Sequence, residues 1–270
     1  MSCTENPQAN FEKATALLRQ AAKQGANILC LSELFRSIYF CQTKEKRFFD
    51  WAEPVPGPTS EALSALAKEL GVVIVASIFE KEKGNHFFNT ACVLDTDGKF
   101  LGKYRKVHIP NDAANYMETH YFESGNLGYP IFHTKFGKIG VLICWDQWYP
   151  EPPRVLAAKG AEIIFYPTAI GFTRGDSGTK ARQEYEAWQI IQRSHAIANN
   201  VFVAAVNRVG KENAIDFWGT SFVAGPLGEI LEKAPQKEEK VCVVPCDLNQ
   251  IAEVRKDWPF LDCRRSKVEA

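Results

Sequence analysis

The chain has 270 residues, of which 46% are hydrophobic and 12% aromatic, and its 32 Lys and Arg residues balance its 32 Asp and Glu residues. This composition excludes disordered, collagen-like and fibrous proteins, and a chain of this length buries about three-quarters of the surface that it exposes when unfolded. A formal charge of zero provides no field to hold nucleic-acid phosphates or anionic lipids, so we expect neither nucleic acid nor a membrane as a partner.

The sequence contains no recognisable targeting or membrane segment. Its first ten residues, MSCTENPQAN, are polar, and no apolar run approaches the roughly 18 residues that span a bilayer. We therefore expect a cytoplasmic protein. The eight cysteines form no CxxC pair and have no His cluster beside them, which indicates free thiols in a reducing compartment and no metal site.

Short β-rich apolar runs alternate with amphipathic stretches, which predicts an α/β fold in one domain over residues 1–270. A helix is expected to begin at Pro7, with Asn6 as its N-cap, and to stop at Gly25. A buried strand is expected over residues 26–31.

A second helix is predicted over residues 60–70, and a strand over 72–79 follows it. Residues 89–106 have the pattern of a β-hairpin, and the Asp97-Gly98 pair favours a type I′ turn. A long irregular region over 107–130 comes next, and loops of this length inside compact domains are often functional.

The second half repeats the order of strand, helix and strand without a detectable sequence repeat. A Pro-started helix follows Cys144, and the longest helical pattern covers residues 179–200. The remaining strand-like stretches cover residues 131–135, 138–144, 161–171, 201–210, 217–232 and 240–246.

Three polar side chains stand where strands are expected to end. Cys144 closes the apolar run IGVLI before a turn and a helix, where helix amides favour a thiolate and a developing oxyanion. Glu33 follows an apolar strand, which suits a general base, and Lys106 ends the hairpin, where it is suited to stabilising an oxyanion. Each has an ordinary alternative, which is a structural thiol, an acid at a helix N-terminus and a solvated lysine.

Glu118 lies in the loop after Lys106 and is a candidate partner of that lysine or a second acid or base. The alternative bases are His108, His120, His133 and His195, none of which falls in a Cys–His signature. The chain lacks GxSxG, Walker, GxGxxG and HExxH motifs, which removes support for serine hydrolases and nucleotide enzymes.

Together, these segments resemble the nitrilase superfamily of carbon–nitrogen hydrolases, whose catalytic set is Glu, Lys and Cys in this chain order. The matching segments are LSELF with Glu33, YRKVHIP with Lys106 and VLICWDQWYPE with Cys144. The family's second glutamate falls in the loop after the lysine, where Glu118 matches and Glu123 is a nearby competitor. Within the superfamily, CWDQWYPE followed by FYPTAIG is similar to amidases that act on N-carbamoylputrescine.

The resemblance implies a four-layer αββα sandwich and a homodimer or higher homo-oligomer. It also implies an opening apolar strand, whereas this chain begins with MSCT, so we expect a missing strand and exposed edges beside it. In some such amidases an acidic residue shortly after TAIG holds the distal amine of the substrate. Phe172 and Thr173 stand there, and the nearby candidate replacements are Asp176, Glu184 and Glu186.

The resemblance also implies a mechanism. Glu33 takes the Cys144 proton, the thiolate attacks a ureido or amide carbonyl, and Lys106 with the Trp145 backbone N–H stabilises the oxyanion. No metal or organic cofactor is expected. The implied substrate contacts come from Trp145, Tyr39, Thr168 and Ala169. Alternative functions are hydrolysis of an ω-amide, an N-carbamoyl amino acid or a nitrile, or non-catalytic binding on the same fold.

Overall fold

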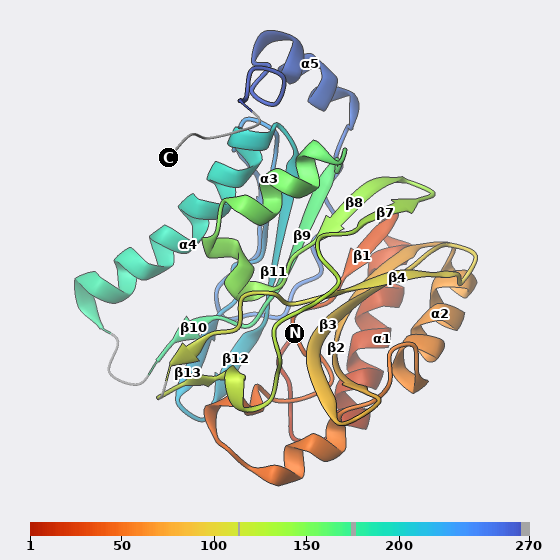
Figure 1. Ribbon diagram of the computed structural model, residues 1–270, viewed down its shortest axis with the longest axis vertical. Helices are drawn as coiled ribbons and strands as arrows, with labels where there is room; N and C mark the ends of the chain where they lie inside the picture. The colour runs from red at the N-terminus through yellow and green to blue at the C-terminus, as the bar shows by residue number, and fades with distance from the viewer. Residues whose placement is uncertain (113, 174–176, 266–270) are drawn as a thin grey trace.

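The computed structural model describes residues 1–112, 114–173 and 177–265. Two sheets pack face to face, with two helices over the outer face of each, so the expected αββα sandwich is confirmed (Figure 1). Helices α1 and α2 cover the first sheet, and α3 and α4 cover the second. The helices are α1 (Pro7–Lys23), α2 (Pro58–Leu70), α3 (Glu151–Ala158), α4 (Gly178–Asn199) and α5 (Asn249–Asp257).

The first sheet has the strand order β1-β2-β3-β4, in which β1 and β2 are parallel and the other pairs antiparallel. Its strands are β1 (Ile28–Cys30), β2 (Val73–Glu82), β3 (His86–Leu94) and β4 (Phe100–Arg105). Side chains alternate along β2, so Val73 and Val75 face the second sheet while Ile74 and Ala76 face the helices. Because both faces are covered there, the first four residues of the strand, 73–76, are apolar without interruption.

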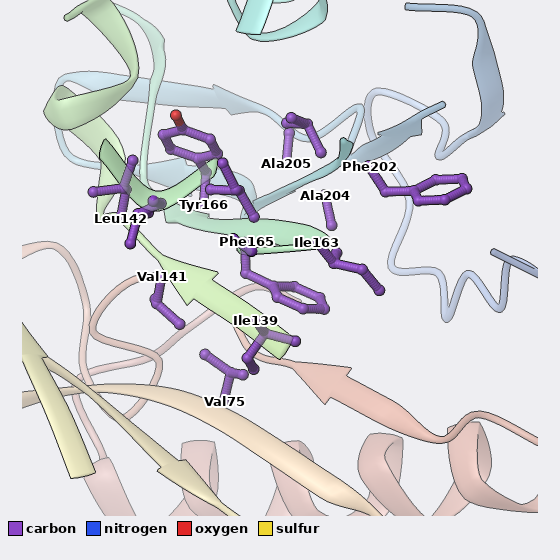
Figure 2. Close-up of a cluster of buried hydrophobic side chains, with 14 of the residues drawn as sticks. Val75, Ile139, Val141, Leu142, Ile163, Phe165, Tyr166, Phe202, Ala204 and Ala205 are labelled. Atoms are coloured by element: carbon purple, nitrogen blue, oxygen red, sulfur yellow. The ribbon is translucent and has the colours of Figure 1, made fainter. Parts of the chain in front are cut away.

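The second sheet has the order β15-β14-β11-β9-β8-β7, and its central strands β8, β9 and β11 are parallel. Its strands are β7 (Ile131–Thr134), β8 (Gly137–Val141), β9 (Ile163–Thr168), β11 (Phe202–Asn207), β14 (Phe222–Ala224) and β15 (Ile230–Lys233). Figure 2 shows Val75 of the first sheet against Ile139 and Val141 of the second. This apolar contact joins the two sheets.

Short elements surround the ends of the central strands. They are the three-stranded sheet β10 (Gly171–Phe172), β13 (Ile215–Trp218) and β12 (Val209–Glu212), the two-stranded hairpin β5 (Asn111–Asp112) and β6 (Tyr116–Met117), and the 3-10 helices η1 (Phe40–Gln42), η2 (Lys46–Trp51), η3 (Glu118–His120) and η4 (Cys144–Trp148). The predicted long region over 107–130 is therefore largely irregular, with one small hairpin and one helical turn inside it.

The helix boundaries follow the predicted caps. The Asn6 side chain accepts hydrogen bonds from the backbone N–H groups of Gln8 and Ala9, at 3.0 and 3.1 Å. Helix α2 stops where Gly71 takes a left-handed conformation with φ of 66°. Its start at Pro58 lies two residues before the predicted one, because proline is well suited to the first turn of a helix.

Two predictions about strands are wrong in detail. The turn between β3 and β4 is not type I′, since Gly98 has a positive φ of 84° but Asp97 does not. Residues 240–246 form no strand, although their pattern is strand-like. They line a cavity of about 920 Å³ together with β1, and no described strand pairs with them. In the described part of the chain, strand β1 is the edge of its sheet.

No helix in the described part of the chain is long and apolar enough to cross a membrane.

The contact between the sheets predicts a large stability difference between two substitutions. Ile139 is fully buried, so Ile139→Ala is expected to lower the free energy of unfolding by about 2–5 kcal/mol. Leu127→Ala, at an exposed position, is expected to change it by less than about 0.5 kcal/mol. Urea unfolding monitored by circular dichroism measures both values. Equal losses in the two variants would contradict the assigned core.

Candidate active site

A lysine lies between two glutamates in the interior of the protein. Lys106 follows β4, and its Nζ is 2.8 Å from Glu33 Oε1 and 2.7 Å from Glu118 Oε2. All three side chains are completely buried, and buried charges are stable only when paired. Burial favours neutral Lys106, but the charges of Glu118 and Glu33 hold its pKa well above the ordinary value. Burial raises the pKa of Glu118 to about 7, against the opposing effect of Lys106.

The two carboxylate oxygens of Glu33 have different surroundings. Oε1 accepts hydrogen bonds from Lys106 and, at 2.7 Å, from Asn89 Nδ2. The Asn89 amide is in turn held by Ser77, whose hydroxyl lies 3.0 Å from Asn89 Oδ1. Oε2 is buried and has no hydrogen-bond partner among the described residues. One oxygen is therefore tethered, and the other is available for a proton.

Cys144 begins η4, just beyond the carboxyl end of β8, and is buried. Its φ of 44° is unusual for a residue with a side chain, and strained backbone of this kind is concentrated at functional sites. Burial raises the pKa of the Cys144 thiol well above its ordinary value, and the charge of Glu33 raises it further. The expected stabilisation of a thiolate by a helix start is thus wrong for the resting protein, because desolvation dominates at this short helical turn. A base must remove the proton.

Asp146 joins the segment that carries Cys144 to the segment that carries Lys106. Its Oδ2 accepts from the Tyr104 hydroxyl at 2.7 Å and from the Ile143 N–H at 2.9 Å. Its Oδ1 accepts from the backbone N–H of His108 at 3.0 Å and lies 2.7 Å from the His108 Nδ1. The sequence did not predict this role for Asp146, although the residue lies within the CWDQWYPE motif. The indication available in the sequence was its position two residues after the candidate nucleophile.

Helix α4 holds the same turn from the outside. His195 Nε2 lies 2.7 Å from the Gln147 carbonyl oxygen, and Trp188 Nε1 donates to Gln147 Oε1 at 3.0 Å. Burial lowers the pKa of His195, which makes it a packed neutral residue and not a base beside the thiol.

The other alternative acids and bases also have different surroundings. His108 is bound to Asp146, His120 packs against the Phe49 ring, and His133 is exposed on β7. Glu123 forms an exposed ion pair with His86 at 2.7 Å. The structure therefore brings Glu118, and not its competitor Glu123, to the buried lysine.

The structure places the four expected substrate-contact residues around this centre. Tyr39 is fully buried, and its hydroxyl donates to Glu118 Oε1 at 2.6 Å, so that group is already engaged. Thr168 ends β9, and its hydroxyl donates to the Tyr166 carbonyl oxygen at 2.9 Å. The backbone of the next residue, Ala169, acts on the Cys144 thiol and lowers its pKa, against the larger effect of burial. Trp145 is half-buried and packs edge-on against Trp148.

Tyr116 is a site residue that the sequence analysis missed. Its ring packs against the Tyr39 ring, with centroids 5.6 Å apart, and its buried hydroxyl has no hydrogen-bond partner among the described residues. Burial raises the pKa of Tyr116, and the negative charge of Glu33 raises it further, so the phenol lies within electrostatic range of Glu33. The available signal was its position two residues before Glu118, because alternate residues of an extended segment share a face.

The segment after TAIG carries an apolar surface where an acid was expected. Phe172 lies on β10 and packs against the Trp218 ring, with centroids 5.1 Å apart. The candidate replacements Glu184 and Glu186 are paired with Lys180 and Arg182 on an exposed face of α4. Asp176 lies outside the described residues.

Within the described ranges, no group of three His, Cys, Asp or Glu side chains is arranged to hold a metal ion.

Comparison with known proteins decides the family. The family model for carbon-nitrogen hydrolases matches residues 1–256. The chain belongs to the carbon–nitrogen hydrolase family. The resemblance to the nitrilase superfamily is therefore confirmed, and the protein is an enzyme of the amidase type, which removes the support for a non-catalytic binding protein.

Individual members of the carbon–nitrogen hydrolase family match almost the whole chain. It is 45% identical to an N-carbamoylputrescine amidase from Solanum lycopersicum, over 98% of this chain and 89% of that protein. It is 35% identical to a citrullinase from Francisella tularensis, over 99% of this chain and 94% of that protein. A carbon–nitrogen hydrolase structure from Helicobacter pylori G27 has 43% sequence identity and a TM-score of 0.93, covering 98% of this chain and 92% of the other.

The raised pKa of Cys144 leads to a prediction about thiol reactivity in this hydrolase. At pH 7 the thiol reacts with iodoacetamide only when a base takes its proton, so Glu33→Gln is expected to slow labelling of Cys144 by about 10²-fold or more. In that variant the rate should keep rising as the pH passes 9, because free thiolate must form first. Peptide mass spectrometry after timed quenching measures the rates.

Cys92 provides the internal control for this labelling. It is buried in β3, and burial raises its pKa to about 12. Without a neighbouring base it is expected to stay unlabelled in both proteins. Equal Cys144 labelling rates in the wild type and in Glu33→Gln would contradict the assignment of the base.

Proposed function

We propose that this carbon–nitrogen hydrolase converts N-carbamoylputrescine to putrescine, carbon dioxide and ammonia. The observation that carries the proposal is the buried Lys106 between Glu33 and Glu118, beside a protonated Cys144 and the free Oε2 of Glu33. The names of the N-carbamoylputrescine amidase and the citrullinase both refer to substrates with a ureido group on an alkyl amine. This shared chemistry supports a ureido substrate.

In the proposed first step, Glu33 Oε2 takes the Cys144 proton and the sulfur attacks the ureido carbon. The net charge of the buried cluster is unchanged, because the negative charge moves from Glu33 to the sulfur. A protonated Glu33 also competes less for the Lys106 ammonium, which can then stabilise the oxyanion. The Trp145 N–H, in the first turn of η4 where amides lack helical partners, provides a second donor.

In the proposed second step, the tetrahedral intermediate collapses and the bond to the terminal nitrogen breaks. Glu33 returns its proton to that nitrogen, and ammonia leaves an N-(4-aminobutyl)carbamoyl thioester on Cys144. Glu33 then activates a water molecule, which cleaves the thioester to restore the thiol. The released alkylcarbamic acid decomposes to putrescine and carbon dioxide. Glu118 keeps Lys106 charged throughout and is itself oriented by Tyr39.

The proposed substrate contacts lie on two sides of the sulfur. We assign the Tyr116 hydroxyl as a hydrogen-bond partner of the ureido group, because it is buried, has no partner in the part of the chain that the structure describes and lies within electrostatic range of Glu33. Thr168 and Ala169 form the opposite wall at the carboxyl end of β9. The Phe172 and Trp218 rings provide an apolar surface for a methylene chain.

We also propose that the enzyme is a cytoplasmic homodimer or a higher homo-oligomer. Exposed apolar side chains support this assembly, since they gather on α4 and on the neighbouring β14–β15 region. The large ones are Ile190, Ile197, Leu227, Ile230 and Leu231.

The proposed reaction is tested by ammonia release from a substrate panel. The panel contains N-carbamoylputrescine, citrulline, an N-carbamoyl amino acid without a side-chain amine, an ω-amide and a nitrile. The account predicts the highest kcat/KM for N-carbamoylputrescine and no turnover by Cys144→Ala, because the nucleophile is gone. Cys144-dependent turnover of another panel member alone would keep the mechanism and replace the substrate. Near-normal activity of Cys144→Ser would contradict the mechanism itself.

Tyr116→Phe tests the assigned phenol. Removing one hydrogen bond to the substrate is expected to lower kcat/KM by about 3- to 10-fold without changing thermal stability, because the hydroxyl has no hydrogen-bond partner within the described ranges. Steady-state kinetics and thermal unfolding measure both effects. An unchanged kcat/KM would remove Tyr116 from the site.

A further inference from the structure

The loop that carries Glu33 is held by side chains from distant parts of the chain. Residues 33–37 follow β1 without forming a regular element, and Leu34 has a left-handed φ of 49°. Backbone in this conformation persists only where surrounding contacts enforce it. A backbone that moves would displace the Glu33 carboxylate, so these contacts bear directly on the proposed base.

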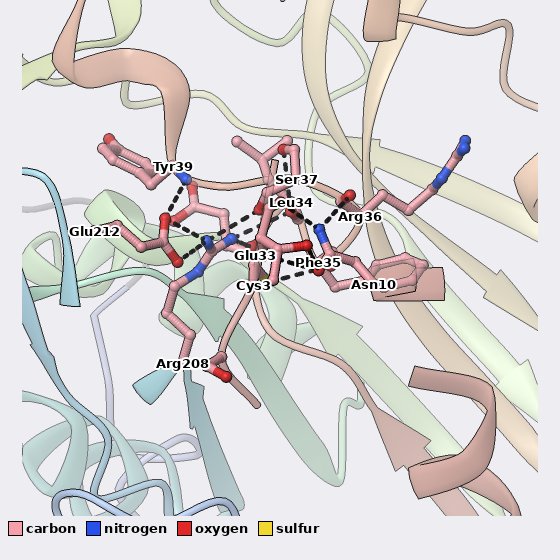
Figure 3. Close-up of polar contacts among 12 residues, drawn as sticks. Cys3, Asn10, Glu33, Leu34, Phe35, Arg36, Ser37, Tyr39, Arg208 and Glu212 are labelled. Carbon is pink, nitrogen blue, oxygen red and sulfur yellow. Dashed lines mark hydrogen bonds and ion pairs between the residues drawn. The ribbon is translucent and has the colours of Figure 1, made fainter. Parts of the chain in front are cut away.

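Every carbonyl oxygen of this loop accepts a hydrogen bond from a side chain outside it, and Figure 3 shows these bonds converging. Arg208 Nη2 donates to the Glu33 oxygen at 2.6 Å and to the Leu34 oxygen at 3.1 Å, and its Nη1 donates to the Ser37 oxygen at 3.1 Å. The remaining donors are the Cys3 thiol to Phe35 and the Asn10 amide to Arg36. Arg208 alone therefore fixes three of five carbonyl groups.

Glu212 completes this arrangement. It lies 2.9 Å from Arg208 Nη1 through its Oε1, and its Oε2 accepts from the Tyr39 N–H. Tyr39 in turn donates its hydroxyl to Glu118. The Arg208–Glu212 pair thus contacts the backbone of Glu33 on one side and the residue that orients Glu118 on the other. Both members are buried, and the Arg208 side chain is completely inaccessible.

The residue before Arg208 holds the other wall of the site. Asn207 Oδ1 accepts from the Ile170 N–H at 3.1 Å, and its Nδ2 donates to the Ile170 carbonyl oxygen at 2.9 Å. Ile170 follows Ala169, whose backbone acts on the Cys144 thiol. Between β11 and β12, Arg208 therefore supports the loop that carries Glu33, and Asn207 supports the segment beside Cys144.

We propose that Arg208, buttressed by Glu212, is a positioning residue of the active site that sets the Glu33 carboxylate relative to Lys106 and Cys144. The inference rests on the proposed function of this site. The planar, forked guanidinium of Arg208 donates to several carbonyl oxygens at once, which the single ammonium of lysine does not do. When the backbone at Glu33 is fixed, the position of Oε2 changes only by rotation about the side-chain bonds.

Two variants separate positioning from folding. Arg208→Lys keeps the charge opposite Glu212 but loses the fork. The double variant Arg208→Met/Glu212→Leu removes both charges together, so that neither is left unpaired, and it also removes the hydrogen bonds to the loop carbonyl groups. Leu63→Ala, at a fully buried position of α2 whose side chain forms no hydrogen bond with the loop, is the control for a general loss of stability.

We expect Arg208→Lys and the double variant to lower kcat on N-carbamoylputrescine by about 10- to 100-fold while KM changes by less than about 3-fold, because the reacting groups and not the binding surface are displaced. Labelling of Cys144 by iodoacetamide at pH 7 should slow in parallel. Leu63→Ala should lose thermal stability but keep kcat and the labelling rate within about 2-fold.

The outcomes are distinguishable from failure of the proposed function. If Arg208→Lys keeps the wild-type kcat and the wild-type Cys144 labelling rate, Arg208 has only a structural role and the inference is overturned. If the wild type turns over no ureido substrate, the proposed substrate is wrong. The labelling rates of Arg208→Lys and Glu33→Gln then still decide the positioning role, because they need no substrate.

Discussion

The rest of this active site depends on one buried charge cluster, the Lys106 ammonium held between the carboxylates of Glu33 and Glu118. All three side chains are completely buried, and removing one partner from such a cluster costs about 3–5 kcal/mol because a charge is left unpaired. When the Cys144 proton moves to Glu33, the total charge of the cluster and Cys144 together does not change. Proton transfer therefore moves negative charge within reach of a fixed ammonium, without bringing charge in from solvent.

The residues of the active site lie in segments that follow the carboxyl ends of strands in both sheets. Glu33 follows β1 and Lys106 follows β4 in the first sheet, whereas Cys144 follows β8 in the second. Apolar packing between the sheets sets the distance, and polar side chains set the orientation. Asp146 accepts hydrogen bonds from the turn that carries Cys144 and from the segment after Lys106. Residues 207–208 bind the backbone of Ile170 on one side and the backbone of Glu33 on the other. The two halves of the sandwich are thus joined by apolar contacts in the core and by hydrogen bonds at the site.

Local patterns in the sequence were sufficient to predict the α/β alternation and the caps of the first helices. The αββα sandwich and the set Glu33, Lys106, Cys144 and Glu118 were implied only by the resemblance of their segments to the nitrilase superfamily, because strand ends alone do not separate catalytic from ordinary polar residues. The sequence did not reveal Arg208, whose carbonyl partners lie about 170 positions earlier and carry no side-chain signature. The turn at Gly98 and the segment 240–246 were misjudged for a related reason. A turn type depends on the loop that two strands leave between them, and a strand exists only beside a partner.

The central claim is that the ureido carbon becomes covalently bound to Cys144 after ammonia leaves, and hydroxylamine trapping tests it most directly. Hydroxylamine is close to water in size and attacks a carbamoyl thioester in its place. With N-carbamoylputrescine as substrate, the account predicts N-hydroxy-N′-(4-aminobutyl)urea, formed in increasing proportion as hydroxylamine is raised, while ammonia release continues. Mass spectrometry of the products identifies it. Ammonia release with putrescine and carbon dioxide as the sole other products, at every hydroxylamine concentration, would contradict the covalent intermediate.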